Sequence, residues 1–322
     1  MPRMVLVFLA LTSLLAGGAA NPSGNRRDAA NSAGTSVANT VSLQHPCGTV
    51  TGSPRADEVL LIWEENHSYR SVIGNPGSPG FNLLAAKCGM ATDYQAIDHP
   101  SLPNYLEITS GALFDRPPWT SDCDAVDSCV TNAASIFSEL VQAKKQWRAY
   151  AESMVSSCQT VSAGQYAARH NPAVYYLAVR RQCRAWDAPL GSAKRGPLHS
   201  ILASGPEIPL ITVTPNIDDD MHSGTITEAN AWLTMWVPQI VYSAAYRSGR
   251  LAVIIAWDEG FGSGDQASSA PLIVMSASTK PGTRSATPFN DFSLLRSISE
   301  ITGVRPLALA ATATSLVPAF RL

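Results

Sequence analysis

Short, nearly continuous apolar runs recur along the chain, separated by longer stretches with helical periodicity. Such runs, rich in Val, Ile and Leu, are typical of strands that are buried on both faces of a parallel sheet. Strands are predicted clearly at 59–64, 210–214, 251–257 and 272–276, and more weakly at 91–97 and 147–151. Helices are predicted at 104–109, 135–145, 227–246 and 292–302, the last capped by Asn290 or Asp291. This alternation predicts an α/β fold with a mostly parallel central sheet sandwiched between helices.

The beginning of the chain has the order of a secretory signal. Arg3 precedes an apolar run at 4–15, and small residues follow at 16–20. Because that run is shorter than the roughly 18 residues of a spanning helix, export is favoured over an uncleaved anchor. Residues 21–45 are mostly small and polar, as in a flexible leader. The sequence therefore predicts a signal peptide at 1–20, a leader at 21–45 and a single domain at 46–322, secreted or in the cell envelope, with no stable membrane span.

Composition narrows the range of partners. A chain of 322 residues with 45% hydrophobic content can bury a sizeable core, as one large domain or two small ones. The formal net charge of -2 gives no basic field that could neutralise many phosphates, so nucleic acid is not an expected partner. Small substrates remain open, and the oligomeric state is not indicated.

Six cysteines follow the predicted signal, and an even number is typical of an oxidising compartment. Fifteen pairings are possible in principle. Nearness in sequence favours Cys123 with Cys129 and Cys158 with Cys183, which leaves Cys47 for Cys88. None of these cysteines has CxxC spacing, which disfavours a thiolate zinc site or a thioredoxin-like redox function.

Polar side chains crowd the positions that follow three of the predicted strands. Glu64, Glu65 and Asn66 follow the first, Asp258 and Glu259 follow the strand at 251–257, and the third set is Asp218, Asp219, Asp220 and His222 after 210–214. In open α/β sheets ligands bind at the carboxyl ends of the strands, so we expect these side chains to form one site.

Two of these pairs suit a divalent cation. Glu65 beside Asn66 offers two hard oxygen donors. Asp258 and Glu259 are adjacent carboxylates without a nearby Lys or Arg in sequence, and a bound cation would relieve their repulsion. The alternative for both pairs is a solvated turn. Oxygen-rich ligands accept Ca²⁺, Mg²⁺ or Mn²⁺ and do not exclude Zn²⁺ or iron.

Three other residues could carry the chemistry. Ser101 lies where a helical pattern begins, a position that favours an anion such as phosphate, so its hydroxyl could attack or could merely cap the helix. His222 is a candidate general acid with a nearby Asp to orient it, or else the cap of an acidic turn. His170 and Asn171 could donate to phosphoryl oxygens or form a structural turn.

Together these segments resemble the bacterial phosphoesterase family of secreted acid phosphatases and phospholipases C, within the alkaline-phosphatase-like superfamily. The resemblance spans about 59–302 and rests on 65–66, 99–105, 170–172, 220–222 and 257–260. It implies that Glu65, Asn66, Asp258 and Glu259 bind the metal. Ser101, activated by the metal, would form a phosphoseryl intermediate.

The resemblance also implies roles for the remaining residues. Asn104 and His170 would hold phosphoryl oxygens, and His222 would protonate the leaving alkoxide. Asp220 would orient His222 or complete the metal shell. Many family members have two aspartates where this chain has Asp258 and Glu259.

Some choices stay open at the level of sequence. Glu64 competes with Glu65, and Asp218 and Asp219 compete with Asp220. A phosphatase with a small polar pocket around Ser101 is favoured over a phospholipase C or phosphodiesterase. The latter would need an apolar groove, formed for example by Trp119, Trp186 or residues 307–316. A cell-envelope binding protein on the same fold is the alternative that is not an enzyme.

Overall fold

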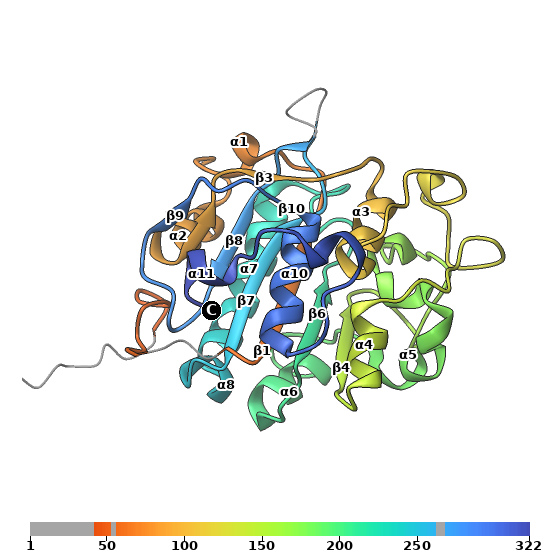
Figure 1. Ribbon diagram of the computed structural model, residues 1–322. Helices are drawn as coiled ribbons and strands as arrows, with labels where there is room; N and C mark the ends of the chain where they lie inside the picture. The colour runs from red at the N-terminus through yellow and green to blue at the C-terminus, as the bar shows by residue number, and fades with distance from the viewer. Residues whose placement is uncertain (1–41, 53–55, 262–267) are drawn as a thin grey trace, which may run out of the picture. The chain divides into compact units, whose positions relative to one another are not determined.

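The computed structural model describes residues 42–52, 56–261 and 268–322, and its helices and strands lie in the unit Ala38–Leu322 (Figure 1). The predicted signal peptide at 1–20 and most of the predicted leader at 21–45 lie outside the described residues. Across these described ranges, no helix combines the length and apolar character needed to cross a membrane.

An eight-stranded sheet forms the centre of this unit, in the order β5-β4-β6-β1-β7-β8-β2-β9. Neighbouring strands are parallel except where β8 pairs with β7 and β2, which confirms the predicted mostly parallel sheet. The strands are β1 Glu58–Glu64, β2 Gly89–Ala91, β4 Trp147–Ala151, β5 Asp187–Pro189, β6 Leu210–Thr214, β7 Leu251–Trp257, β8 Leu272–Met275 and β9 Thr283–Ser285. Every residue of β1, β6 and β7 is buried, which explains why these strands follow the apolar runs so closely.

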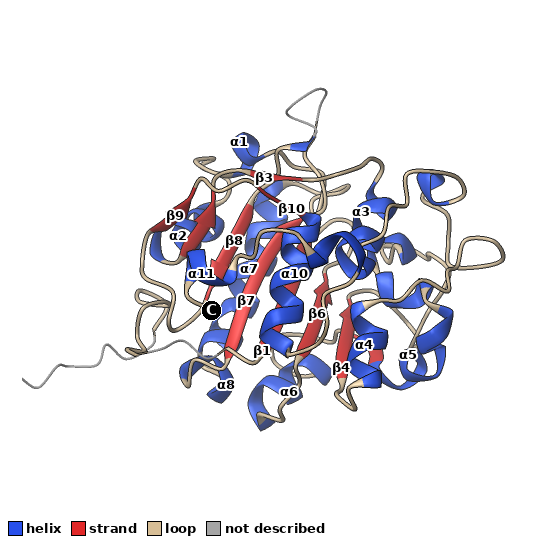
Figure 2. Cartoon of the chain, in the orientation of Figure 1, coloured by secondary structure: helices blue, strands red, loops and turns tan. Residues whose placement is uncertain are grey.

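Helices cover both faces of the sheet (Figure 2). One face carries α3 Ser101–Ser110, α4 Ile136–Gln142 and α10 Asp291–Thr302. The other carries α2 Pro79–Lys87, α6 Pro197–Ser204, α7 Ile226–Val241 and α8 Ala244–Arg247. The remaining α-helices of the described ranges are α1 Tyr69–Val72, α5 Arg180–Trp186 and α11 Val317–Phe320, and the 3₁₀ helices are η1 Trp119–Ser121, η2 Ala168–His170, η3 Pro172–Tyr175, η4 Leu177–Val179 and η5 Ala308–Ala311.

Two predicted elements are each divided in the structure. The predicted strand at 91–97 becomes β2 and β3 Tyr94–Gln95, because β3 leaves the main sheet and pairs with β10 Phe289–Asn290. The predicted helix at 227–246 ends at Val241 and resumes as α8. The break falls at Ser243, whose side chain accepts the backbone N–H of Tyr246 and so begins a new helix.

The start of α10 is hydrogen-bonded to β3 and to the loop before α3. Asn290 caps this helix in a reciprocal capping box with Ser293, so the cap is Asn290 and not Asp291. Asp291 instead accepts the Tyr94 hydroxyl at 2.6 Å and the backbone N–H of Ile97 at 3.2 Å. These bonds hold the chain that leads into Ser101.

All three predicted disulfides are present. Cys47 pairs with Cys88 at the end of α2, Cys158 pairs with Cys183 in α5, and Cys123 pairs with Cys129 to close a small loop. Disulfides of this number are typical of proteins that fold in an oxidising compartment.

Candidate active site

The carboxyl ends of β6, β1 and β7 lie next to one another, and hydrogen bonds extend their pairing into the loops beyond. The Glu65 N–H donates to Asp220 O at 2.9 Å, and the Asp258 N–H donates to Glu64 O at 3.1 Å. Asn66 has a φ of 45°, in the left-handed region that asparagine tolerates better than most residues. Its N–H donates to Asp258 Oδ1 at 3.3 Å. The loops that follow β1, β6 and β7 are therefore in direct contact.

Three buried carboxyl groups gather where β1 and β7 end. Asp258 Oδ1 accepts the backbone N–H of Glu259 at 2.7 Å, whereas Asp258 Oδ2 is buried without a hydrogen-bond partner. Burial, reinforced by the nearby Glu65, raises the pKa of Asp258 well above its usual range and that of Glu259 to about 9. An orphaned buried oxygen among crowded carboxylates fits a hard divalent cation. The donor set of Glu65, Asn66, Asp258 and Glu259 therefore suits a metal of this class.

Two histidines contact Glu65. His170 Nε2 lies 2.7 Å from Glu65 Oε1, and His222 Nδ1 lies 2.9 Å from Glu65 Oε2. Burial alone would raise the pKa of Glu65, but these two histidines outweigh it and hold the pKa well below its usual range. Glu65, His170 and His222 present ligand atoms within 4.8 Å of one another, so this group could also hold a metal ion.

His170 lies between two carboxylates, because its Nδ1 also contacts Asp220 Oδ2 at 2.8 Å. Burial lowers the pKa of His170, yet Glu65 and Asp220 together raise it to about 9. Both ring nitrogens are thus engaged by protein carboxylates. The predicted donation from His170 to a phosphoryl oxygen would require one of these contacts to be exchanged.

Asp220 reaches His222 through the backbone. Its Oδ1 accepts the His222 N–H at 2.8 Å, while its Oδ2 faces His170. The competing Asp219 accepts from Asn216 at 3.3 Å and lies outside these contacts. Of the three adjacent aspartates, Asp220 is the one placed to orient the histidines.

The Glu64 carboxyl group makes no hydrogen bond with this cluster. It is fully buried, and neither carboxylate oxygen has a hydrogen-bond partner. Burial and the neighbouring Asp220 and Asp219 raise the pKa of Glu64 well above its usual range, which favours the neutral acid. Of the two adjacent glutamates, Glu65 is therefore the one that contacts His170 and His222.

Ser101 is the first residue of α3, and its side chain is buried. The N-cap of the helix is Pro100, and no side chain caps it. The capping alternative for Ser101 is therefore not supported. The hydroxyl lies at a helix N-terminus, where backbone N–H groups and the dipole favour an anion.

Asn104 connects this helix to the carboxylate cluster. Its Oδ1 accepts the Asp98 N–H at 2.9 Å, and its Nδ2 donates to Asp98 O at 2.8 Å and to Glu259 Oε2 at 3.4 Å. His99 Nδ1 lies 2.5 Å from the same Glu259 oxygen. The first turn of α3 and the loop before it are thereby fixed relative to Glu259.

Two residues of the site were not predicted from the sequence. Arg169 Nη2 lies 2.9 Å from His222 Nε2, and Asp122 Oδ1 accepts the Leu102 N–H at 2.9 Å. Arg169 directly precedes the predicted His170, which is the one sequence signal it offers. Asp122 lies at positive φ in an irregular loop, where neither periodicity nor a motif identifies it.

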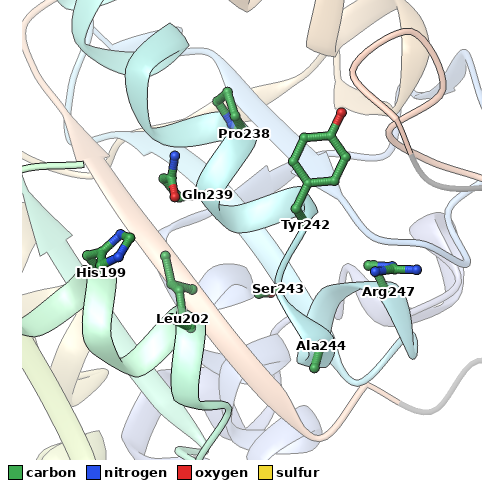
Figure 3. A pocket seen from close by; sticks show the side chains of 9 residues that line it. His199, Leu202, Pro238, Gln239, Tyr242, Ser243, Ala244 and Arg247 are labelled. Atoms are coloured by element: carbon green, nitrogen blue, oxygen red, sulfur yellow. The ribbon is translucent and has the colours of Figure 1, made fainter. Parts of the chain in front are cut away.

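Three of the residues considered for a lipid groove pack against other parts of the protein, whereas Leu309 in the tail at 307–316 is exposed. Trp186 packs against Trp147, and Trp119 packs against Phe114. Leu316 in the predicted tail is buried, and its N–H donates to Ser297 in α10. A hollow of about 340 Å³ between α6, α7 and α8 contains none of the predicted site residues (Figure 3); it is lined by His199, Leu202, Ala203, Pro238, Gln239, Tyr242, Ser243, Ala244 and Arg247.

Asn171 has a structural role, because its Nδ2 donates to the buried Asp187 Oδ2 at 2.9 Å. Burial raises the pKa of Asp187 to about 7, although the bond from Asn171 opposes this. The folded state therefore holds a proton that the unfolded chain releases near pH 4, so stability falls as pH rises from about 4 to about 7.

Asp187→Asn is expected to remove this part of the pH dependence, because the amide does not ionise. The unfolding free energy of the variant minus that of the wild type should be larger at pH 8 than at pH 5, by an amount on the order of 3 kcal/mol. The difference in melting temperature should change in the same direction. Thermal unfolding at both pH values measures this, with the exposed Asp115→Asn as the matched control. Equal shifts at the two pH values would show that Asp187 does not titrate in this range.

Comparison with known proteins identifies the family of this chain. The sequence pattern of the phosphoesterase family matches residues 78–305, a range that includes Ser101, His222 and Asp258. The chain is 29% identical over 262 residues to phosphatidylinositol-3-phosphatase from Mycobacterium tuberculosis, covering 81% of each protein. It is 26% identical over 218 residues to a phosphate-repressible acid phosphatase from Penicillium chrysogenum, covering 63% of this chain and 48% of that one. The chain thus spans about half of this fungal relative.

The fold is also found among solved structures. A protein in the alkaline phosphatase superfamily from Vibrio parahaemolyticus superposes with a TM-score of 0.55 at 10% identity, covering 84% of this chain and 72% of that chain. The likeness confirms the alkaline-phosphatase-like α/β fold.

Proposed function

This chain belongs to the phosphoesterase family, and we propose that it is an exported, metal-dependent phosphatase that acts through a phosphoserine. The observation that carries the proposal is the gathering of Glu65, Asp258 and Glu259 around a buried, orphaned carboxylate oxygen at one end of the sheet. Such a cluster holds a cation that can also take a phosphoryl oxygen. This cluster is therefore the proposed metal site of the hydrolase.

Ser101 is the proposed nucleophile. Its oxygen would form a bond to phosphorus while the bond to the leaving oxygen breaks, and the α3 N-terminus would stabilise the negative charge of the phosphoryl group. A divalent metal bound by Glu65, Asn66, Asp258 and Glu259, with Ser101, would lower the pKa of the hydroxyl and neutralise developing charge. Asn104 holds the first turn of α3 against Glu259 and so fixes the direction of attack.

His222 is the proposed acid for the leaving alkoxide. Its Nδ1 faces Glu65, so its Nε2 is the nitrogen directed away from the carboxylate cluster. Because Nε2 accepts from Arg169 in this structure, it would first take up a proton from solvent and then give it to the leaving oxygen. Asp220 holds the His222 backbone and, through His170, the other oxygen of Glu65. Water then attacks the phosphoserine, which releases inorganic phosphate and regenerates the Ser101 hydroxyl.

A phosphomonoester is the favoured substrate class. The relative from Mycobacterium tuberculosis is named for a phosphomonoester on an inositol lipid, and the relative from Penicillium chrysogenum is named an acid phosphatase. A phosphoinositide is therefore the second substrate to test, and a phospholipase C or phosphodiesterase activity is the alternative. Export is supported by the three disulfides and the predicted signal at 1–20.

The test is the hydrolysis of matched chromogenic phosphomonoester and phosphodiester substrates by mature protein purified from culture medium. We expect turnover of the monoester, its loss after treatment with a chelator, and its return when one of Ca²⁺, Mg²⁺, Mn²⁺ or Zn²⁺ is restored. Turnover that survives complete metal removal would overturn the metal-dependent part. Inactivity on both substrates with every metal would contradict the function, and recovery of the protein only from the cytosolic fraction would contradict export.

A further inference from the structure

Arg169 places a guanidinium group at the edge of the proposed active site. Its Nη2 lies 2.9 Å from His222 Nε2, and because arginine nitrogens only donate, Nε2 accepts in this contact. Its Nε is buried without a hydrogen-bond partner and lies 3.8 Å from Asp122 Oδ2. The side chain is only 20% exposed. A half-buried guanidinium that leaves one donor unused can bind a further anionic partner.

Asp122 connects this guanidinium to the helix of the nucleophile. Its Oδ1 accepts the N–H of Leu102, the residue directly after Ser101, while its Oδ2 faces Arg169. The next residue, Cys123, is held by its disulfide to Cys129. Asp122 thus lies between Arg169 and the N-terminus of α3 and contacts both.

Arg169 has contacts on both sides of the place where the phosphoryl group would lie. In an in-line displacement the phosphoryl group lies between the nucleophile, here Ser101, and the acid for the leaving group, here His222. Arg169 touches the His222 nitrogen that faces away from Glu65, and through Asp122 it is tied to the residue after Ser101. η2, which carries Arg169, also packs directly against α3.

The charge of the site favours such a residue. Glu65, Asp258 and Glu259 make the centre acidic, and a phosphomonoester brings further negative charge. Among the Lys and Arg residues in the described ranges, Arg169 is the one whose recorded contacts reach a proposed site residue. Guanidinium presents two parallel N–H donors that match two phosphate oxygens, and a phosphate oxygen is a stronger acceptor than a neutral imidazole nitrogen.

We propose that Arg169 is a further catalytic residue that exchanges His222 Nε2 for two nonbridging oxygens of the substrate phosphoryl group, with Asp122 as its positioning residue. This inference rests on the proposed phosphatase function. It assigns to Arg169 the recognition of a phosphate monoester group, whichever organic group that phosphate carries. No bond to Arg169 forms or breaks in the reaction.

The experiment compares Arg169→Gln and Arg169→Lys with the wild type in the metal-loaded protein. Steady-state kinetics on 4-nitrophenyl phosphate are measured beside the dissociation constant of inorganic phosphate from calorimetry. We expect Arg169→Gln to lower kcat/KM by about 100-fold or more and to weaken phosphate binding by about 10-fold or more. Arg169→Lys should recover little of either, because an ammonium group cannot form the paired bonds.

Arg184→Gln is the matched control, because Arg184 is an exposed arginine in α5 outside the proposed site. It should leave both quantities unchanged. Thermal unfolding establishes that each variant is folded, and Arg169→Lys, which keeps the positive charge, carries the test if Arg169→Gln does not fold. Values of kcat/KM and phosphate affinity within threefold of the wild type in the folded variants would overturn the proposal.

A double-mutant cycle with Asp122→Asn separates positioning from direct contact. Asp122→Asn should weaken phosphate binding in the wild type and have little additional effect in Arg169→Gln, because it acts through the guanidinium. Additive effects would contradict the positioning role. A wild type that hydrolyses no phosphoester would contradict the proposed function, whereas an active wild type with unaffected Arg169 variants would contradict only this inference.

Discussion

Ser101→Ala is expected to lower kcat on a chromogenic phosphomonoester by at least about four orders of magnitude, because the phosphoserine can no longer form. The substitution removes one buried hydroxyl at the first position of α3, which has no side-chain capping bond there. We therefore expect the melting temperature and the bound metal to stay close to those of the wild type. Kinetics, thermal unfolding and elemental analysis of the purified variant measure the three quantities.

Ser110→Ala is the matched control for this prediction, because Ser110 is a buried serine at the other end of the same helix. Its hydroxyl accepts the Ala112 N–H, so the control loses a structural bond and should keep its activity. Ser101→Ala with more than a tenth of the wild-type kcat would show that Ser101 is not the nucleophile. An intermediate phosphorylated at Ser101, trapped in the wild type and absent from the variant, would confirm the covalent step.

Much of the fold could be predicted because its central strands are buried on both faces. β6 and β7 begin and end where the apolar runs do, since every position in such a strand favours an apolar side chain. The prediction failed at 91–97, where β2 and β3 belong to different sheets and are separated by the polar Thr92 and Asp93. The polar pair marks the break, but the partner of β3, which is β10 almost 200 residues later, cannot be predicted from the local sequence.

The helix predicted at 227–246 failed for a local reason. Its apolar periodicity continues through Tyr242 and Ala245, but Ser243 accepts the Tyr246 N–H and starts a new helix. A serine within an apolar pattern has this effect only when its side chain turns back to the backbone. The pattern of apolar residues does not contain that information.

The candidate site was predictable to the extent that it follows strand ends. Glu65, Asp220 and Asp258 come directly after or near the ends of neighbouring parallel strands, so topology alone brings them together. Their partners required the structure, because His170 comes from a short 3₁₀ helix and contacts both Glu65 and Asp220. Asp122 lies in an irregular loop, and its two contacts have no counterpart in the sequence pattern.

The second prediction with a large expected effect concerns the metal ligands. Two possible sets of ligands share Glu65. One set is Glu65 with Asn66, Asp258 and Glu259, and the other is Glu65 with His170 and His222. The orphaned Asp258 Oδ2 favours the first set. His170 Nε2 and Glu65 Oε1 also lack an aligned hydrogen bond, but they lie 2.7 Å from each other, whereas Asp258 Oδ2 has neither a hydrogen bond nor an ion pair. Asp258→Asn should therefore remove the bound metal and lower kcat by about three orders of magnitude or more.

Metal content measured by elemental analysis after dialysis tests this independently of activity. Asp219→Asn is the matched control, because Asp219 lies beside the site but contacts Asn216 instead of the carboxylate cluster, and we expect it to retain the metal. Metal retained by Asp258→Asn and lost by His222→Ala would replace the first donor set with the second. His222 would then be a ligand through the ring nitrogen that faces Glu65, and only its other ring nitrogen, Nε2, or another residue could protonate the leaving group.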